Sequence, residues 1–201
     1  LLASSNRADA AYTVDLRSCL PSDWSDGERA QIVQCALFDA AAFGKVRFHH
    51  RQYQDYLAAC WLARLMHNDL PLSELRHLLF LQGPKRQLTL RPSLAPIAAW
   101  LACLEASGSR WQEQFREDLL AAAPWVFFSN GDPQRLPSEY KDHVLQRVVE
   151  HFKDRKRVQI DLDAPTLKRF ADPALAPVVS RWINDQNIGP ELRADDIELV
   201  R

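Results

Sequence analysis

Three proline-centred segments recur along the chain at nearly equal intervals. They begin at Pro92, Pro133 and Pro173, so that successive segments start 41 and 40 residues apart. The first and third also share a pattern, because Pro-Ser-Leu-Ala-Pro-Ile at 92–97 matches Pro-Ala-Leu-Ala-Pro-Val at 173–178. Proline in the first turn of a helix removes no hydrogen bond. Each segment is therefore predicted to open a helix, and the period near 40 favours a helical repeat of the HEAT type.

Composition and periodicity both favour helices. The 201 residues include 12 prolines but only six glycines, the residue that closes sharp turns. Beyond Pro71 apolar residues return at the helical period in short stripes, and no strand is predicted there. The stripes are Leu75, Leu78 and Leu79; Leu94, Ile97, Leu101 and Leu104; Trp111, Phe115 and Leu119; Tyr140, Val144, Val148 and Phe152; Leu167 and Phe170; and Leu175, Val178 and Trp182. A chance spacing among 12 prolines is the alternative to a repeat.

The first 70 residues show a different pattern, in which a short strand lies between two helices. Ser25-Asp26-Gly27-Glu28 predicts a capped helix start, and we expect that helix to end near Phe38. Residues 43–48 alternate apolar and basic side chains after a glycine, which predicts a strand. A second helix is expected from Arg51 to about His67. Its predicted apolar stripe is Tyr53, Leu57, Cys60 and Leu65.

Charge and cysteine usage limit the classes of partner and compartment. The chain has 25 Lys and Arg against 26 Asp and Glu, so it lacks the positive field of a dedicated nucleic-acid or anionic-membrane binder. Its four cysteines are far apart, and three fall in apolar helical patterns, which predicts free thiols in a reduced, cytoplasmic compartment. The six tryptophans are interpreted mainly as core residues. We therefore expect a protein partner, with no nucleic acid and no membrane.

The common catalytic and metal-binding motifs are missing from the sequence. The segment nearest to a phosphate-binding loop, Gln82-Gly83-Pro84-Lys85-Arg86, lacks the second glycine, the Gly-Lys pair and the Ser/Thr. No two of the six histidines are four residues apart, and neither Cys-x-x-Cys nor Gly-x-Ser-x-Gly occurs. We expect no catalytic residue, metal or cofactor in this chain. A small-molecule hydrolase, with polar groups gathered near His143 or Asp161, is a remote alternative.

The densest motif is Phe48-His49-His50-Arg51-Gln52-Tyr53-Gln54-Asp55-Tyr56-Leu57-Ala58-Ala59. It resembles the F-x-H-R-x-x-Q-E-Y-L-A-A signature that closes the winged-helix part of NACHT-type NTPases. These belong to the STAND class, which includes animal NLR receptors and bacterial antiviral sensors. Eight positions match, whereas Asp55 stands where the family has Glu. Residues 98–102 and 123–132 look, more loosely, like the helical segments that follow NACHT modules in large bacterial members.

The resemblance implies a nucleotide-sensing role for one histidine. In the family the histidine of this motif, here His50, reaches the β-phosphate of ADP held by the NTPase domain and locks the resting state. By the same resemblance the motif is supported by Phe48, Arg51, Gln54, Asp55 and Tyr56. ATP or ADP would be bound by a domain preceding Leu1, and the absence of an initiator Met leads us to expect a piece of a longer protein. The alternative for His50 is structural: a histidine bonded to backbone at a strand-to-helix junction.

These observations lead to one expected organisation. The fold is predicted to be mainly α, with a short winged-helix-like α+β segment over residues 1–70 and a HEAT-like array of antiparallel helix pairs over 71–201. The expected function is that of a non-catalytic regulatory and sensor part of a STAND/NACHT-like ATPase. Its partner would be another protein, the protein's own NTPase domain or a second copy of the chain. The alternative is a stand-alone helical interaction scaffold, in which the motif is an ordinary amphipathic helix start.

Overall fold

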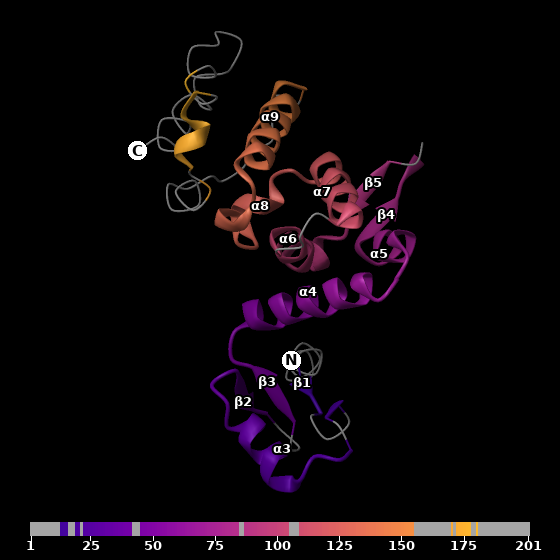
Figure 1. Cartoon of the computed structure of the whole chain (residues 1–201), viewed down its shortest axis with the longest axis vertical. Helices are drawn as coiled ribbons and strands as arrows, with labels where there is room; N and C mark the ends of the chain where they lie inside the picture. Colours follow the sequence, from indigo (N-terminus) through magenta and orange to yellow (C-terminus); the bar gives the residue numbers. More distant parts are fainter. Residues whose placement is uncertain are drawn as a thin grey trace, which may run out of the picture. The chain divides into compact units, whose positions relative to one another are not determined.

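The computed structural model describes residues 13–15, 19, 20, 22–41, 45–84, 87–104, 109–154, 170, 172–177 and 180. These residues are mainly helical, with a few short antiparallel strands (Figure 1). The chain divides into two units, Leu1–Leu57 and Ala58–Arg201, and helix α4 (Arg51–His67) carries the boundary. Within the described ranges, no helix combines the length and the apolar character that crossing a bilayer requires.

A three-stranded antiparallel sheet forms part of the first unit. Its strands are β1 (Thr13–Val14), β2 (Phe38–Ala40) and β3 (Val46–Phe48), in the order β1-β3-β2. The central strand buries Val46, which pairs with Val14 on one side and Ala40 on the other. The strand predicted within residues 43–48 is therefore confirmed at Val46–Phe48.

Helix α3 (Asp26–Val33) begins as predicted but ends earlier. The Ser25 hydroxyl accepts a hydrogen bond from the Glu28 N–H, and the Glu28 carboxylate accepts one from the Ser25 N–H, which completes a capping box. The predicted end near Phe38 is wrong, because Phe38 begins β2. There it lies opposite Phe48, with ring centroids 4.9 Å apart. This cross-strand pairing outweighs the local helical spacing.

The limits predicted for α4 are confirmed, but its predicted buried stripe is wrong. Tyr53 and Leu57 are exposed, and so is Trp61, although the tryptophans were interpreted mainly as core residues. The buried positions lie on the opposite face and are Asp55, Ala59, Leu62 and Met66. Because α4 carries apolar side chains on both faces, its periodicity does not determine which face meets the core.

The second unit combines helices with one hairpin. Within residues 68–154, apart from the gaps at 85–86 and 105–108, its α-helices are α5 (Leu72–Leu79), α6 (Ala95–Cys103), α7 (Arg110–Ala122), α8 (Val126–Ser129) and α9 (Ser138–Asp154). Strands β4 (Phe80–Gln82) and β5 (Leu88–Leu90) pair antiparallel, so the expectation of no strand after Pro71 is wrong. Phe80 and Leu90 lie opposite each other and are both buried. Strands of three residues show too little alternation to be recognised, and burial of this pair is what stabilises them.

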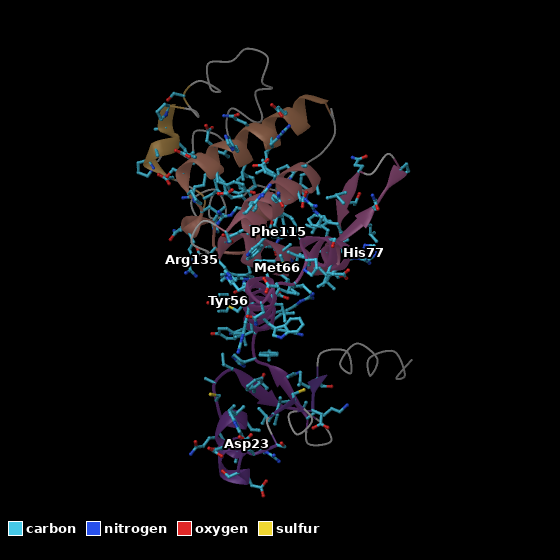
Figure 2. All side chains as sticks on the ribbon, turned by 45° about the vertical axis from the view of Figure 1, so that its right-hand side comes forward. Asp23, Tyr56, Met66, His77, Phe115 and Arg135 are labelled. Carbon is cyan, nitrogen blue, oxygen red and sulfur yellow. The ribbon has the colours of Figure 1, made fainter. Side chains whose placement is uncertain are left out.

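One buried cluster joins these elements, with α7 in contact with α5, α6, α9 and β5. Figure 2 shows Phe115 and Met66 among the closely packed side chains of this unit. The ring of Phe127 meets Tyr140 edge-on at 5.7 Å, and the Tyr140 hydroxyl donates to the Arg116 carbonyl at 2.8 Å. Burial raises the pKa of Tyr140 far above its ordinary value, so this hydroxyl remains a donor at any physiological pH.

Each proline-centred segment opens a helical turn, as predicted. The three turns are 3₁₀ helices: η3 (Pro92–Leu94), η4 (Pro133–Arg135) and η5 (Pro173–Leu175). The first continues directly into α6, and the second precedes α9. Of the predicted stripes, Leu167, Val178 and Trp182 lie outside the described residues.

Replacing Gly131 by Ala is expected to destabilise the second unit. Gly131 has φ +75°, and an added Cβ would lie 3.0 Å from the backbone carbonyl of Ala99 and 3.2 Å from Cys103 Sγ. The strained backbone and the close contact should lower the free energy of unfolding by about 2 kcal/mol or more, measured by urea denaturation. Gly83→Ala is the control, since its Cβ meets only Gln87 O at 3.4 Å. Equal stability of the two variants would contradict the requirement for glycine at 131.

Candidate functional site

The motif at 48–59 spans the junction between a strand and a helix. Phe48 ends β3, His49 and His50 form a bend, and α4 begins at Arg51. The His49 N–H donates to the Leu37 carbonyl at 2.8 Å, and the Tyr53 N–H donates to the His50 carbonyl at 3.0 Å. These bonds hold the backbone of the bend, while both histidine side chains are exposed.

The two histidines have different surroundings. His49 Nδ1 lies 3.0 Å from a carboxylate oxygen of Asp39, which also pairs with Arg47 at 3.7 Å. The His50 ring meets His49 edge-on at 4.4 Å and Tyr53 at 5.8 Å. Within the described ranges the His50 ring makes these aromatic contacts and no hydrogen bond to backbone. Its nitrogens are therefore accessible to a ligand, which is the property that the nucleotide-sensing hypothesis requires.

The residues expected to support the motif lie on β3 and the first turns of α4. Phe48, Gln54 and Tyr56 are half-buried. Asp55 is only 6% exposed, and burial raises the pKa of its carboxyl group, an effect that Arg51 opposes. The Arg51 Nε lies 3.9 Å from the Asp55 carboxylate, beyond hydrogen-bond distance. The charge of the Asp55 carboxylate is therefore weakly compensated by Arg51.

The groups at this junction would favour an anion. An imidazole can donate to a phosphate oxygen, and the adjacent Arg51 and the start of a 17-residue helix favour negative charge. Among the residues that the structure describes, no three His, Cys, Asp or Glu side chains gather as metal ligands would.

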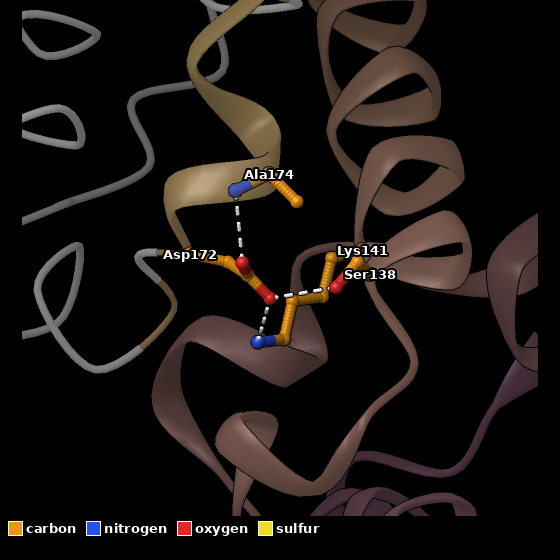
Figure 3. Close-up of polar contacts among 4 residues, drawn as sticks. All are labelled: Ser138, Lys141, Asp172 and Ala174. Atoms are coloured by element: carbon orange, nitrogen blue, oxygen red, sulfur yellow. Dashed lines mark hydrogen bonds and ion pairs between the residues drawn. The ribbon is translucent and has the colours of Figure 1, made fainter.

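A second polar cluster joins α9 to η5 (Figure 3). The Asp172 carboxylate accepts hydrogen bonds from the Ser138 hydroxyl at 2.8 Å, the Lys141 ammonium at 3.1 Å and the Ala174 N–H at 3.0 Å. The sequence analysis missed this cluster. Its local signal is the Ser-x-x-Lys spacing, which occurs in some serine hydrolases, whereas Asp172 lies 31 residues beyond Lys141 in no recognisable pattern.

The chemistry of the Asp172 cluster favours anchoring over catalysis. The backbone hydrogen bond from Ala174, and then those from Ser138 and Lys141, hold the pKa of Asp172 below its usual range, which makes it a weak base. Lys141 is buried, and its ammonium is engaged by the Asp172 carboxylate at 3.1 Å. Of the groups considered for a hydrolase, His143 is exposed on α9 and Asp161 lies outside the described residues.

Comparisons with known proteins identify no relative. The chain matches no protein-family model, no curated protein and no solved structure. Function is therefore inferred from the residues themselves, chiefly from the exposed His50 and the buried Asp55.

Asp55→Asn is expected to remove a pH dependence of stability. Because burial raises the pKa of Asp55 in the folded state, the folded protein holds this proton more tightly than the unfolded chain, whose Asp pKa is about 3.9. The contribution of protonated Asp55 is complete below that value and is lost as the pH rises towards the folded-state pKa. At neutral pH the variant should equal or exceed the wild type in stability. Urea denaturation between pH 3.5 and 7 tests this, and a pH-independent difference would contradict it.

Asp172→Ala is expected to cost far more than the loss of a surface ion pair. It would leave the ammonium of Lys141, a residue that is 3% exposed, without its carboxylate, at a cost of about 3–5 kcal/mol in the free energy of unfolding. Asp172→Ala combined with Lys141→Met should recover much of this loss. Glu150→Ala on the same helix is the control, because its pair with Arg147 is exposed and should contribute under about 0.5 kcal/mol. If Asp172→Ala and Glu150→Ala lower the free energy of unfolding equally in urea denaturation, Asp172 does not anchor η5 to α9.

Proposed function

We propose that this chain is a non-catalytic regulatory and sensor part of a STAND/NACHT-like ATPase, acting in the cytoplasm. The observation that carries the proposal is His50, exposed at the β3–α4 junction within the motif that resembles the family signature. None of the four cysteines, all of them in the described part of the chain, forms a disulfide, which supports the reduced compartment.

The topology of the first unit supports a winged-helix-like assignment. Helix α3 lies between β1 and the β2–β3 hairpin in the chain, and the sheet order is β1-β3-β2. A winged helix has this connectivity: a helix, then a hairpin whose second strand pairs with the first strand of the domain. The motif begins at Phe48, the last residue of that second strand, and this place agrees with a signature that closes the winged-helix part.

The proposed mechanism depends on a contact that exists in one state only. The His50 ring donates a hydrogen bond to the β-phosphate of ADP in an NTPase domain outside this chain, and Arg51 adds positive charge beside it. Movement of the two domains apart breaks the contact and releases the resting state. Because the ring makes no hydrogen bond to backbone among the described residues, this change breaks no internal bond of the motif.

The helical second unit would recognise the partner. In the proposal its helices form a HEAT-like array, supported by the three 3₁₀ turns that begin at Pro92, Pro133 and Pro173. A stand-alone interaction scaffold is the second candidate, and the exposed apolar residues of α4 favour it. The coding sequence before Leu1 distinguishes the two: a P-loop followed by an acidic Walker B strand supports the first, and a nearby start codon supports the second.

His50→Ala in the full-length protein should weaken retention of ADP. Loss of one hydrogen bond to a charged phosphate should raise the dissociation rate of a fluorescent ADP analogue by about 10-fold to 100-fold and lower the ADP that co-purifies. His49→Ala is the matched control, because His49 is also exposed but is held by Asp39. ADP retention that is unchanged in His50→Ala would remove this residue from the mechanism.

A further inference from the structure

Two exposed histidines lie side by side at the β3–α4 junction. The rings of His49 and His50 meet edge-on, with centroids 4.4 Å apart. Both side chains are exposed, so accessibility does not distinguish them. An imidazole nitrogen of either residue can donate a hydrogen bond, and rings in contact with each other can reach the same phosphate oxygen. Another group at the junction must therefore decide which of the two binds.

The strand register places a carboxylate beside His49. Asp39 on β2 lies opposite Arg47 on β3. The hairpin pairing continues past β3, because the His49 N–H donates to the Leu37 carbonyl at 2.8 Å. Since side chains two residues apart in a strand share a face, His49 lies on the same face as Arg47 and diagonally across from Asp39. The Asp39 carboxylate accordingly lies 3.0 Å from His49 Nδ1.

This pairing makes the two rings unequal. His49 Nδ1 is engaged by a carboxylate, whereas the His50 nitrogens have no hydrogen-bond partner among the residues that the structure describes. Arg47 Nε lies 3.7 Å from the same carboxylate, beyond hydrogen-bond distance. A phosphate beside His49 would meet the negative charge of Asp39, whereas His50 is followed directly by Arg51. The two neighbouring imidazoles therefore differ in both availability and local charge.

We infer that Asp39 is a positioning residue, which engages His49 and thereby selects His50 as the histidine that contacts the phosphate. This inference rests on the proposed function and adds to it the residue that decides between two adjacent imidazoles. Asp39 acts through His49 and touches no nucleotide itself. Removal of its carboxylate would release His49, and both rings could then donate to the same phosphate.

The reactivity of His49 in the chain alone tests this selection without nucleotide. Diethyl pyrocarbonate acylates an accessible imidazole nitrogen, and peptide mass spectrometry follows each ring in a variant that lacks the other. Asp39→Ala should speed acylation of His49 about twofold to fivefold, the range expected of an exposed ion pair, and leave His50 unchanged. Asp39→Glu should keep His49 slow. Asp26→Ala removes an exposed carboxylate from α3 and is the matched control, which should change neither rate.

Release of ADP by the full-length protein tests the consequence for binding. With Asp39 present, His49→Ala should leave the dissociation rate of a fluorescent ADP analogue unchanged. In Asp39→Ala the same replacement should raise this rate about tenfold, because His49 then also donates to the phosphate. A merely structural role of Asp39 would give His49→Ala the same effect in both backgrounds. Asp39→Asn, which keeps the size of the side chain, repeats the measurement should Asp39→Ala fail to fold.

Two results would each overturn the inference. One is a reactivity of His49 that does not change when the Asp39 carboxylate is removed. The other is an effect of His49→Ala on ADP release that is equal with and without that carboxylate. The proposed function fails by a different result, unchanged ADP release in His50→Ala, and the reactivity of His49 still shows in that case whether Asp39 controls the ring.

Discussion

The second unit depends on the packing of α7. This helix contacts α5, α6, α9 and β5, and its buried Phe115 and Leu119 belong to the common core. Polar contacts also join α7 to α5. The Asp118 carboxylate accepts two hydrogen bonds from the Arg76 guanidinium on α5, at 2.6 and 3.1 Å. Apolar burial supplies most of the stabilisation, whereas a bidentate pair restricts how the two helices align. The hairpin and the shorter helices therefore have a rigid support.

Helix α4 carries apolar residues on two opposite faces. Its buried face contributes Leu62 and Met66 to the core, and its other face leaves Leu57 and Trp61 in solvent. A helix that is apolar all round is normally buried all round. Helix α4 instead carries large apolar side chains on both faces, and only one of these faces is buried. Because both faces carry apolar residues, the periodicity of the sequence does not predict which face is buried.

The candidate site was only partly predictable. The motif identified His50, and the strand predicted within residues 43–48 and the helix expected from Arg51 placed it between a strand and a helix. Two properties that decide its chemistry were not in the pattern: the histidine beside it pairs with Asp39, ten residues away, and Asp55 is buried. The Asp172 anchor was missed because its partners are 31 and 34 residues distant in sequence, beyond the range of any local periodicity.

The sequence by itself determined the features that depend on neighbouring residues. These include the Ser25–Glu28 capping box, the limits of α4 and the three proline-led turns, because helix starts and stops are decided within a few residues. Only the tertiary structure decided that Phe38 begins a strand, that β4 and β5 pair, and which face of α4 is buried. Such outcomes depend on contacts between distant segments, where burial and cross-strand pairing outweigh local preference.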